Sequence, residues 1–219
     1  MSGVRHWFSR GPAIDRARPV GQGRWLVVDV ESSGLDASRD RLIAVGALAV
    51  TDGSVDLGDG FEAVLRQDTP SGQANIEVHG IGGVEQSRGE DPREALEAFL
   101  EFAGTDPLLA WHAPFDARML QRGAREYLGR RYAPAWIDLA ELAPLAWPER
   151  VALGTSLDGW LAALDIPVRQ RHRAIADCLA TAQLFAALLP HMGRLGAPNA
   201  GALASLSSGA RWLRGPGSS

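Results

Sequence analysis

Two carboxylates, Asp29 and Glu31, follow directly on the apolar run Trp25–Val28. The run is short and rich in β-branched residues, which predicts a strand over residues 25–30. Side chains at positions i and i+2 share one face of a strand, so both carboxylates point the same way. They repel each other unless a cation neutralises them. Taken alone, the pair has the alternative reading of a solvated strand end at a turn.

Two further acids, Asp116 and Asp177, are predicted near the starts of helices. Asp116 ends the segment WHAPFD, which follows the apolar residues 107–110. Its alternative reading is an ordinary helix-start aspartate, which backbone N–H groups and the helix dipole favour. Asp177 stands among apolar neighbours in the last long helical segment. A carboxylate that faces the core there requires a partner.

His172 precedes Asp177 by five residues and is the candidate general base. A neutral imidazole accepts protons well near pH 7. The alternative is a surface histidine close to a helix N-terminus. Because the predicted helix begins at about Arg173, the imidazole is expected just outside it.

The elements that must position these side chains indicate an α/β domain with a mixed sheet. Three strands are expected as an antiparallel meander, and two shorter strands follow in alternation with helices. The expected strands lie at about 25–30, 41–50, 61–66, 107–111 and 136–137, and the helices at about 91–103, 114–128, up to 147, 156–164 and 173–189. Residues 67–90 are expected to be irregular.

In such a sheet the first strand is central and the fourth lies beside it. Asp29, Glu31 and Asp116 then converge at one edge of the sheet, and the last helix brings Asp177 to them. Four carboxylates in one place require cations, and all-oxygen ligands suit Mg²⁺ or Mn²⁺. We therefore expect two divalent cations, a site suited to in-line displacement at a phosphodiester. A structural Ca²⁺ site is disfavoured because no EF-hand spacing is present.

The chain has 219 residues and a net charge of −4, which is unfavourable for a nucleic-acid partner. Two bound divalent cations would add about +4 of charge at the site and so offset the negative net charge locally. The single cysteine, Cys178, allows no intrachain disulfide, so a cytoplasmic location is expected. No membrane partner is expected, because no apolar stretch of about 20 residues is apparent. Composition predicts a flexible leader at 1–24, a domain at 25–190 and a disordered tail at 191–219.

Four short segments, read in order, resemble the DEDDh 3′→5′ exonucleases, which include the proofreading epsilon subunit of bacterial replicative polymerase. They are VDVESSGL at 28–35, VHGI at 78–81, APFD at 113–116 and HRAIAD at 172–177. The resemblance spans about residues 25–190 and places the chain in the histidine branch of that family. It implies a ribonuclease H-like fold.

The resemblance also implies residue roles. Asp29, Glu31, Asp116 and Asp177 would hold two divalent ions, with Asp29 bridging them, and His172 would deprotonate the attacking water. The implied substrate-binding residues are His79, Gly80, Ile81, His112 and Phe115. His112 stands where the family usually has Asn, and we interpret it as a residue that supports the site rather than a metal ligand.

The expected substrate is a nucleic acid with a free 3′ end, with single-stranded DNA favoured and proofreading or repair as the setting. RNA is the first alternative, because metal ions contact phosphate and not sugar. A second alternative is an inactive nucleic-acid-binding module associated with a DNA polymerase, which is also a candidate partner. Three arginines on one helix, Arg118, Arg122 and Arg125, are candidate phosphate contacts or simply a solvated face.

Overall fold

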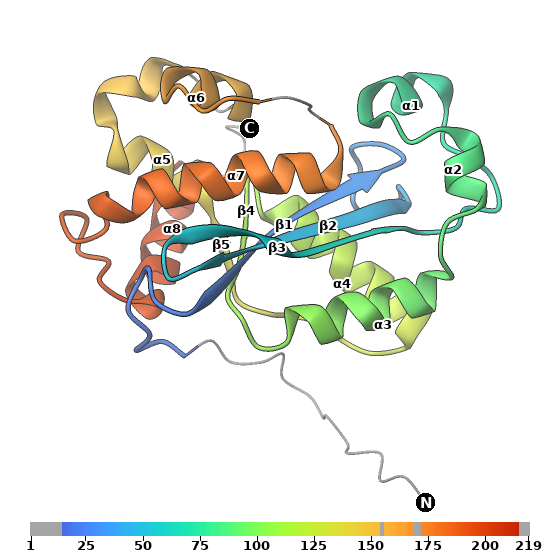
Figure 1. Cartoon of the computed structure of the whole chain (residues 1–219), viewed down its shortest axis with the longest axis horizontal. Helices are drawn as coiled ribbons and strands as arrows, with labels where there is room; N and C mark the ends of the chain where they lie inside the picture. Colours follow the sequence, from blue (N-terminus) through green and yellow to red (C-terminus); the bar gives the residue numbers. More distant parts are fainter. Residues whose placement is uncertain (1–14, 154–155, 169–171, 215–219) are drawn as a thin grey trace, which may run out of the picture.

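The computed structural model describes residues 15–153, 156–168 and 172–214. A twisted five-stranded sheet forms the centre of this part of the chain, and helices cover both of its faces (Figure 1). The architecture confirms the predicted α/β class with a mixed sheet.

The strands are arranged in the order β3-β2-β1-β4-β5. β1 pairs antiparallel with β2, and β2 with β3, whereas β4 and β5 run parallel to β1. This is the predicted meander followed by parallel strands, with β1 in the centre. The strand bounds are β1 Arg24–Ser32, β2 Leu42–Thr51, β3 Ser54–Val64, β4 Leu108–Ala110 and β5 Trp136–Asp138.

The strand β3 begins at Ser54, whereas the sequence predicts a strand only from about residue 61. The additional residues are mostly polar or glycine. Its partners jump from Gly60, opposite Leu48, to Asp56, opposite Ala49. Three residues of β3 therefore bulge out of the ladder. An edge strand with a bulge tolerates such a composition, which hides it from pattern reading.

One long helix, α7, crosses one face of the sheet and contacts β1, β2 and β3, while α3 and α4 lie on the opposite face (Figure 1). Each face has its own apolar cluster of buried side chains. The helix bounds are α1 Gln73–His79, α2 Gly83–Ser87, α3 Pro92–Ala103, α4 Pro114–Leu128, α5 Leu139–Ala146, α6 Leu157–Ala163, α7 Ala174–Leu188 and α8 Ala200–Arg214, with short 3₁₀ segments at Pro148–Leu153 and Leu189–His191.

The segment 67–90 was expected to be irregular, but it contains the helices α1 and α2. Both helices are short and begin after a glycine without a side-chain cap. They are held instead by buried polar side chains, chiefly His79 and Gln86. Tertiary contacts of this kind leave no periodic signal in the sequence.

The chain beyond residue 190 also differs from the disorder expected of it. In α8 the side chains of Ala200, Leu203 and Ser207 are buried, and the helix packs against α5 and β5. Small residues allow this close approach despite the low-complexity composition. Part of the predicted leader is ordered as well, since Pro19 forms a bridge with Asn199. Residues 1–14 and 215–219 lie outside the described residues.

The window Ala174–His191 is long and apolar enough to cross a membrane by length and composition alone. This departs from the expectation that no stretch of the chain is so apolar. Half of the window is buried inside the domain, because α7 packs along the sheet. Its composition is accounted for by that core position.

Candidate active site

Three of the four expected acids come together where β1 ends and α7 begins. Carboxylate oxygens of Asp29, Glu31 and Asp177 all lie within 4.8 Å of one another. Asp29 and Glu31 are half-buried on β1, and Asp177 is buried in the first turn of α7. Like charges this close repel strongly in a partly desolvated position, so the donor set fits a divalent cation with oxygen ligands.

The fourth acid, Asp116, lies beside this cluster. Its side chain is buried, and Oδ1 accepts a hydrogen bond of 3.1 Å from the backbone N–H of Val30, the residue between Asp29 and Glu31. Burial raises the pKa of Asp116 well above its usual value; the carboxylates of Asp138 and Glu31 add to this, whereas backbone hydrogen bonds oppose it. A nearby cation would favour the charged form of all these groups.

The turn that leads to Asp116 explains the histidine at position 112. His112 has a φ of 58°, in the left-handed region. Among residues other than glycine, Asn, Asp and His adopt this conformation most readily. The backbone N–H of His112 donates to Oδ1 of Asp138 at 3.0 Å, while its side chain is exposed. Phe115, in the first turn of α4, packs against the core on the α3–α4 side.

His172 is exposed next to the acidic cluster. Its φ is 60°, and its backbone N–H donates to Oδ2 of Asp177 at 3.2 Å. The following residue, Arg173, pairs with Glu85 of α2 at 3.1 Å. The backbone at His172 is thus held by its hydrogen bond to Asp177 and, one residue later, by the ion pair between Arg173 and Glu85.

His79 and Ile81, which the resemblance places near the terminal nucleotide, have buried side chains. Nδ1 of His79 accepts from the backbone N–H of Ile81 at 2.9 Å. Nε2 therefore carries the proton and donates to Oδ1 of Asn75 at 2.8 Å. Burial lowers the pKa of His79. Of the three residues in this segment only Gly80 is exposed, so its backbone is the part available to a ligand.

Comparison with known proteins places these residues in a family. The exonuclease family matches residues 26–185. The chain belongs to the exonuclease family. A DNA polymerase III subunit epsilon-like protein of Rhodobacter capsulatus is 30% identical over 189 residues, 84% of this chain. A PolC-type DNA polymerase III of Thermotoga petrophila is 29% identical over 175 residues, 78% of this chain. The match spans only 26% and 12% of the length of those two relatives.

Solved structures of exonucleases share the fold of this family member. Exonuclease X in complex with 5′ overhanging duplex DNA aligns with a TM-score of 0.64 and 21% identity, covering 84% of this chain and 99% of that one. The zinc-bound E. coli ExoI–ssDNA complex aligns with a TM-score of 0.68 and 20% identity, covering 80% and 42%. The fold is therefore the ribonuclease H-like fold that the resemblance implies.

Asp138 is a site residue that sequence reasoning missed in this exonuclease-family chain. It is buried at the end of β5, and Oδ1 accepts from the backbone N–H groups of His112 and Ala140. It thus joins the left-handed turn before α4 to the start of α5. An aspartate directly before a helix is a capping signal, which predicts the bond from Ala140. The bond from His112 depends on the fold and leaves no local signal.

Proposed function

We propose that this protein is a metal-dependent exonuclease that removes nucleotides one at a time from the 3′ end of single-stranded DNA. The observation that carries the proposal is the cluster of Asp29, Glu31 and Asp177 within 4.8 Å, in a chain that belongs to the exonuclease family. Buried Asp116 beside the cluster and exposed His172, whose backbone donates to Asp177, would supply the remaining side chains.

The four carboxylates would hold two divalent cations, Mg²⁺ or Mn²⁺. Bound there, such ions would supply positive charge to the phosphate and stabilise both the entering and the leaving oxygen. The net charge of −4 is then no obstacle, because the strongest local field at the site is that of the ions.

The protein's own part in the reaction centres on His172. Its exposed imidazole accepts a proton from a water molecule whose oxygen forms a bond to phosphorus. The bond between phosphorus and the 3′ oxygen of the preceding nucleotide breaks. The products are a nucleoside 5′-monophosphate and a chain shortened by one. The hydrogen bond from the His172 backbone to Asp177 keeps the base next to the acids.

DNA is preferred as the substrate because the aligned solved structures are complexes with overhanging duplex DNA and with single-stranded DNA. RNA is the alternative, since the carboxylate cluster has no feature that distinguishes the sugars. The epsilon-like and PolC-type relatives support association with a DNA polymerase as a further proposal. The buried free thiol of Cys178 supports a cytoplasmic location.

The test is digestion of a 5′-labelled single-stranded DNA oligonucleotide with Mg²⁺ or Mn²⁺, resolved on a gel. Asp177→Ala removes one acid of the cluster. Glu97→Ala is the matched control, because it removes an exposed carboxylate from α3. We expect a one-nucleotide ladder from the parent and from Glu97→Ala. The ladder should be lost in Asp177→Ala, by at least about 100-fold in rate, and in EDTA.

A ladder of equal intensity from Asp177→Ala would refute the assignment of the site. An RNA oligonucleotide of the same sequence is digested in parallel. Faster shortening of the RNA would replace the proposed DNA substrate, and survival of both strands would indicate a binding module instead.

A further inference from the structure

Gly46 lies beside Asp29 in the β1–β2 ladder, on the face of the sheet that α7 covers. A Cβ atom at this position would lie 2.5 Å from the carbonyl carbon of Ala174, 2.7 Å from the nitrogen of Ile175 and 2.8 Å from Cβ of Ala174. Two of these three atoms belong to the backbone of α7. No side-chain rotation relieves such contacts, so the first turn of α7 rests directly on the backbone of β2.

The same turn of α7 carries Asp177. The backbone N–H of Asp177 donates to the carbonyl of Arg173 and so closes the first turn of α7. This turn holds Asp177 in a fixed position relative to Ala174. Asp29 lies on β1, and its backbone is directly paired with that of Gly46 in the β1–β2 ladder. Its position relative to Gly46 is therefore fixed. The separation between the two carboxylates therefore depends on how closely α7 approaches β2 at Gly46.

We propose that Gly46 is a positioning residue of the active site. By lacking a side chain, it sets the separation of Asp177 from Asp29 and Glu31, and through it the affinity of the cluster for divalent cations. The inference deepens the proposed function and rests on it. A methyl group at position 46 must move the first turn of α7 by about 1 Å, since close-packed backbone cannot be compressed.

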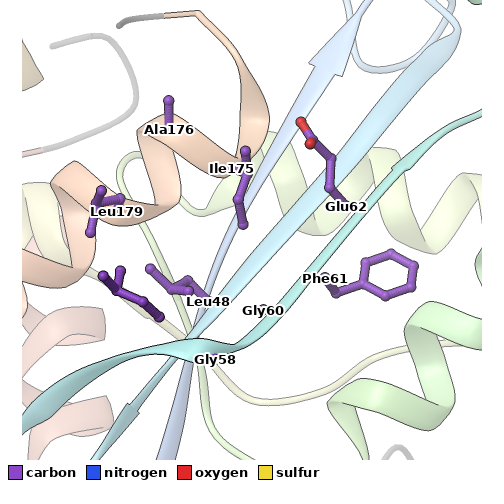
Figure 2. Close-up of a pocket in the computed structure, with 9 residues that line it drawn as sticks. Leu48, Gly58, Gly60, Phe61, Glu62, Ile175, Ala176 and Leu179 are labelled. Carbon is purple, nitrogen blue, oxygen red and sulfur yellow. The ribbon is translucent and has the colours of Figure 1, made fainter. Parts of the chain in front are cut away.

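Gly60 provides a matched control under the same helix. It lies on the neighbouring strand β3, and a Cβ there would lie 3.3 Å from Cδ1 of Leu48 and 3.7 Å from Cδ1 of Ile175. The nearest backbone atom, the carbonyl oxygen of Ala47, would lie at 3.6 Å, an ordinary van der Waals distance. Figure 2 shows Gly60 below Ile175. Both residues line an open groove between β3 and α7, which has a volume of about 430 Å³. The nearest side-chain ends have room to move, so Gly60→Ala adds the same methyl group without displacing α7.

The experiment compares the parent protein with Gly46→Ala and Gly60→Ala. Crystal structures report the position of α7, calorimetric titration with Mn²⁺ reports cation affinity, and digestion of single-stranded DNA reports the rate. For Gly46→Ala we expect α7 to be displaced at its first turn, Mn²⁺ affinity to fall about tenfold and the rate to fall about 100-fold, as for a misplacement of about 1 Å. Gly60→Ala should stay within about twofold of the parent in affinity and rate.

An undisplaced α7 with parental Mn²⁺ affinity in Gly46→Ala would overturn the proposal. If Gly46→Ala does not fold, the double variant Gly46→Ala/Ala174→Gly relieves part of the crowding by removing the contact with Cβ of Ala174. The two backbone contacts remain, so this variant should fold with weakened Mn²⁺ binding. Failure of both variants to fold would also overturn the proposal, because Gly46 would then serve folding alone. A parent that binds Mn²⁺ but digests no DNA would refute the proposed function, yet the structures and the titration would still test Gly46.

Discussion

Single residues in this chain act through contacts that join separate elements. The Asp116 carboxyl binds the backbone of Val30, which lies between two other acids, and Asp138 binds the turn before Asp116. The acids themselves were predictable from the sequence, because Asp29 and Glu31 follow an apolar run and Asp177 interrupts one. Asp138 was not, since its partner His112 is 26 residues away.

His79 is a predicted substrate-binding residue whose side chain is buried in the structure. The resemblance puts it near the terminal nucleotide, but its ring is buried and bonded to Asn75 and to the backbone of Ile81. Which side of a one- or two-turn helix faces inward depends on the elements packed around it. We expect His79 to hold the shape of the segment around Gly80 rather than to touch a ligand.

The buried His79 leads to a pH prediction. Because burial lowers its pKa below the ordinary value of 6.5, the unfolded chain binds a proton more readily than the folded protein. The stability that depends on neutral His79 is therefore complete above pH about 6.5 and is lost as the pH falls through the lower folded pKa.

Nuclear magnetic resonance of the imidazole should show the Nε2–H tautomer and a titration midpoint below 6.5. A midpoint for His79 at or above 6.5 would contradict the buried, neutral assignment.

At the scale of elements, the long helices and the central strands follow from their apolar patterns. The helix α4 begins at Pro114 as predicted, and α7 begins at Ala174, one residue from its expected start. One long helix, α8, is an exception because most of its residues are small. The other exceptions, α1, α2 and the first half of β3, are short or lie at an edge. Such elements are stabilised by tertiary contacts and carry too few residues for a period to emerge.

The helix α8 offers a direct test of tertiary stabilisation. Leu203 is fully buried, and Ser207 accepts a hydrogen bond from the backbone N–H of Asp138 at 2.9 Å. We expect Leu203→Ala to lower the free energy of unfolding by about 2–5 kcal/mol, the usual loss for a buried leucine. Ser208→Ala, at an exposed neighbouring position, should change it by less than about 0.5 kcal/mol. Urea unfolding followed by circular dichroism measures both.

Equal stability of the two variants would mean that α8 does not pack as described. The result would then favour the disordered tail that the composition suggests. The packing matters for the site, because Ser207 binds the residue that supports the turn before α4.

For the whole molecule, segments before and after the family match at residues 26–185 pack against the matched domain. The backbone around Pro19 pairs with the residues that lead into α8, and α8 covers β5 at one edge of the sheet. The overall class and the central sheet were predictable, because alternating apolar segments leave few topologies. The packing of the two flanking segments was not predictable, because their small residues form no strong apolar pattern.

The most direct measurement of the central claim is the product formed in water enriched in oxygen-18. A single-stranded DNA oligonucleotide is digested with Mn²⁺, and the released material is identified by mass spectrometry. We expect nucleoside 5′-monophosphates from the 3′ end, each carrying one heavy oxygen on its phosphate, because water attacks phosphorus and the 3′ oxygen leaves. Release of nucleoside 3′-phosphates or of longer fragments, or products without the heavy oxygen, would contradict the account.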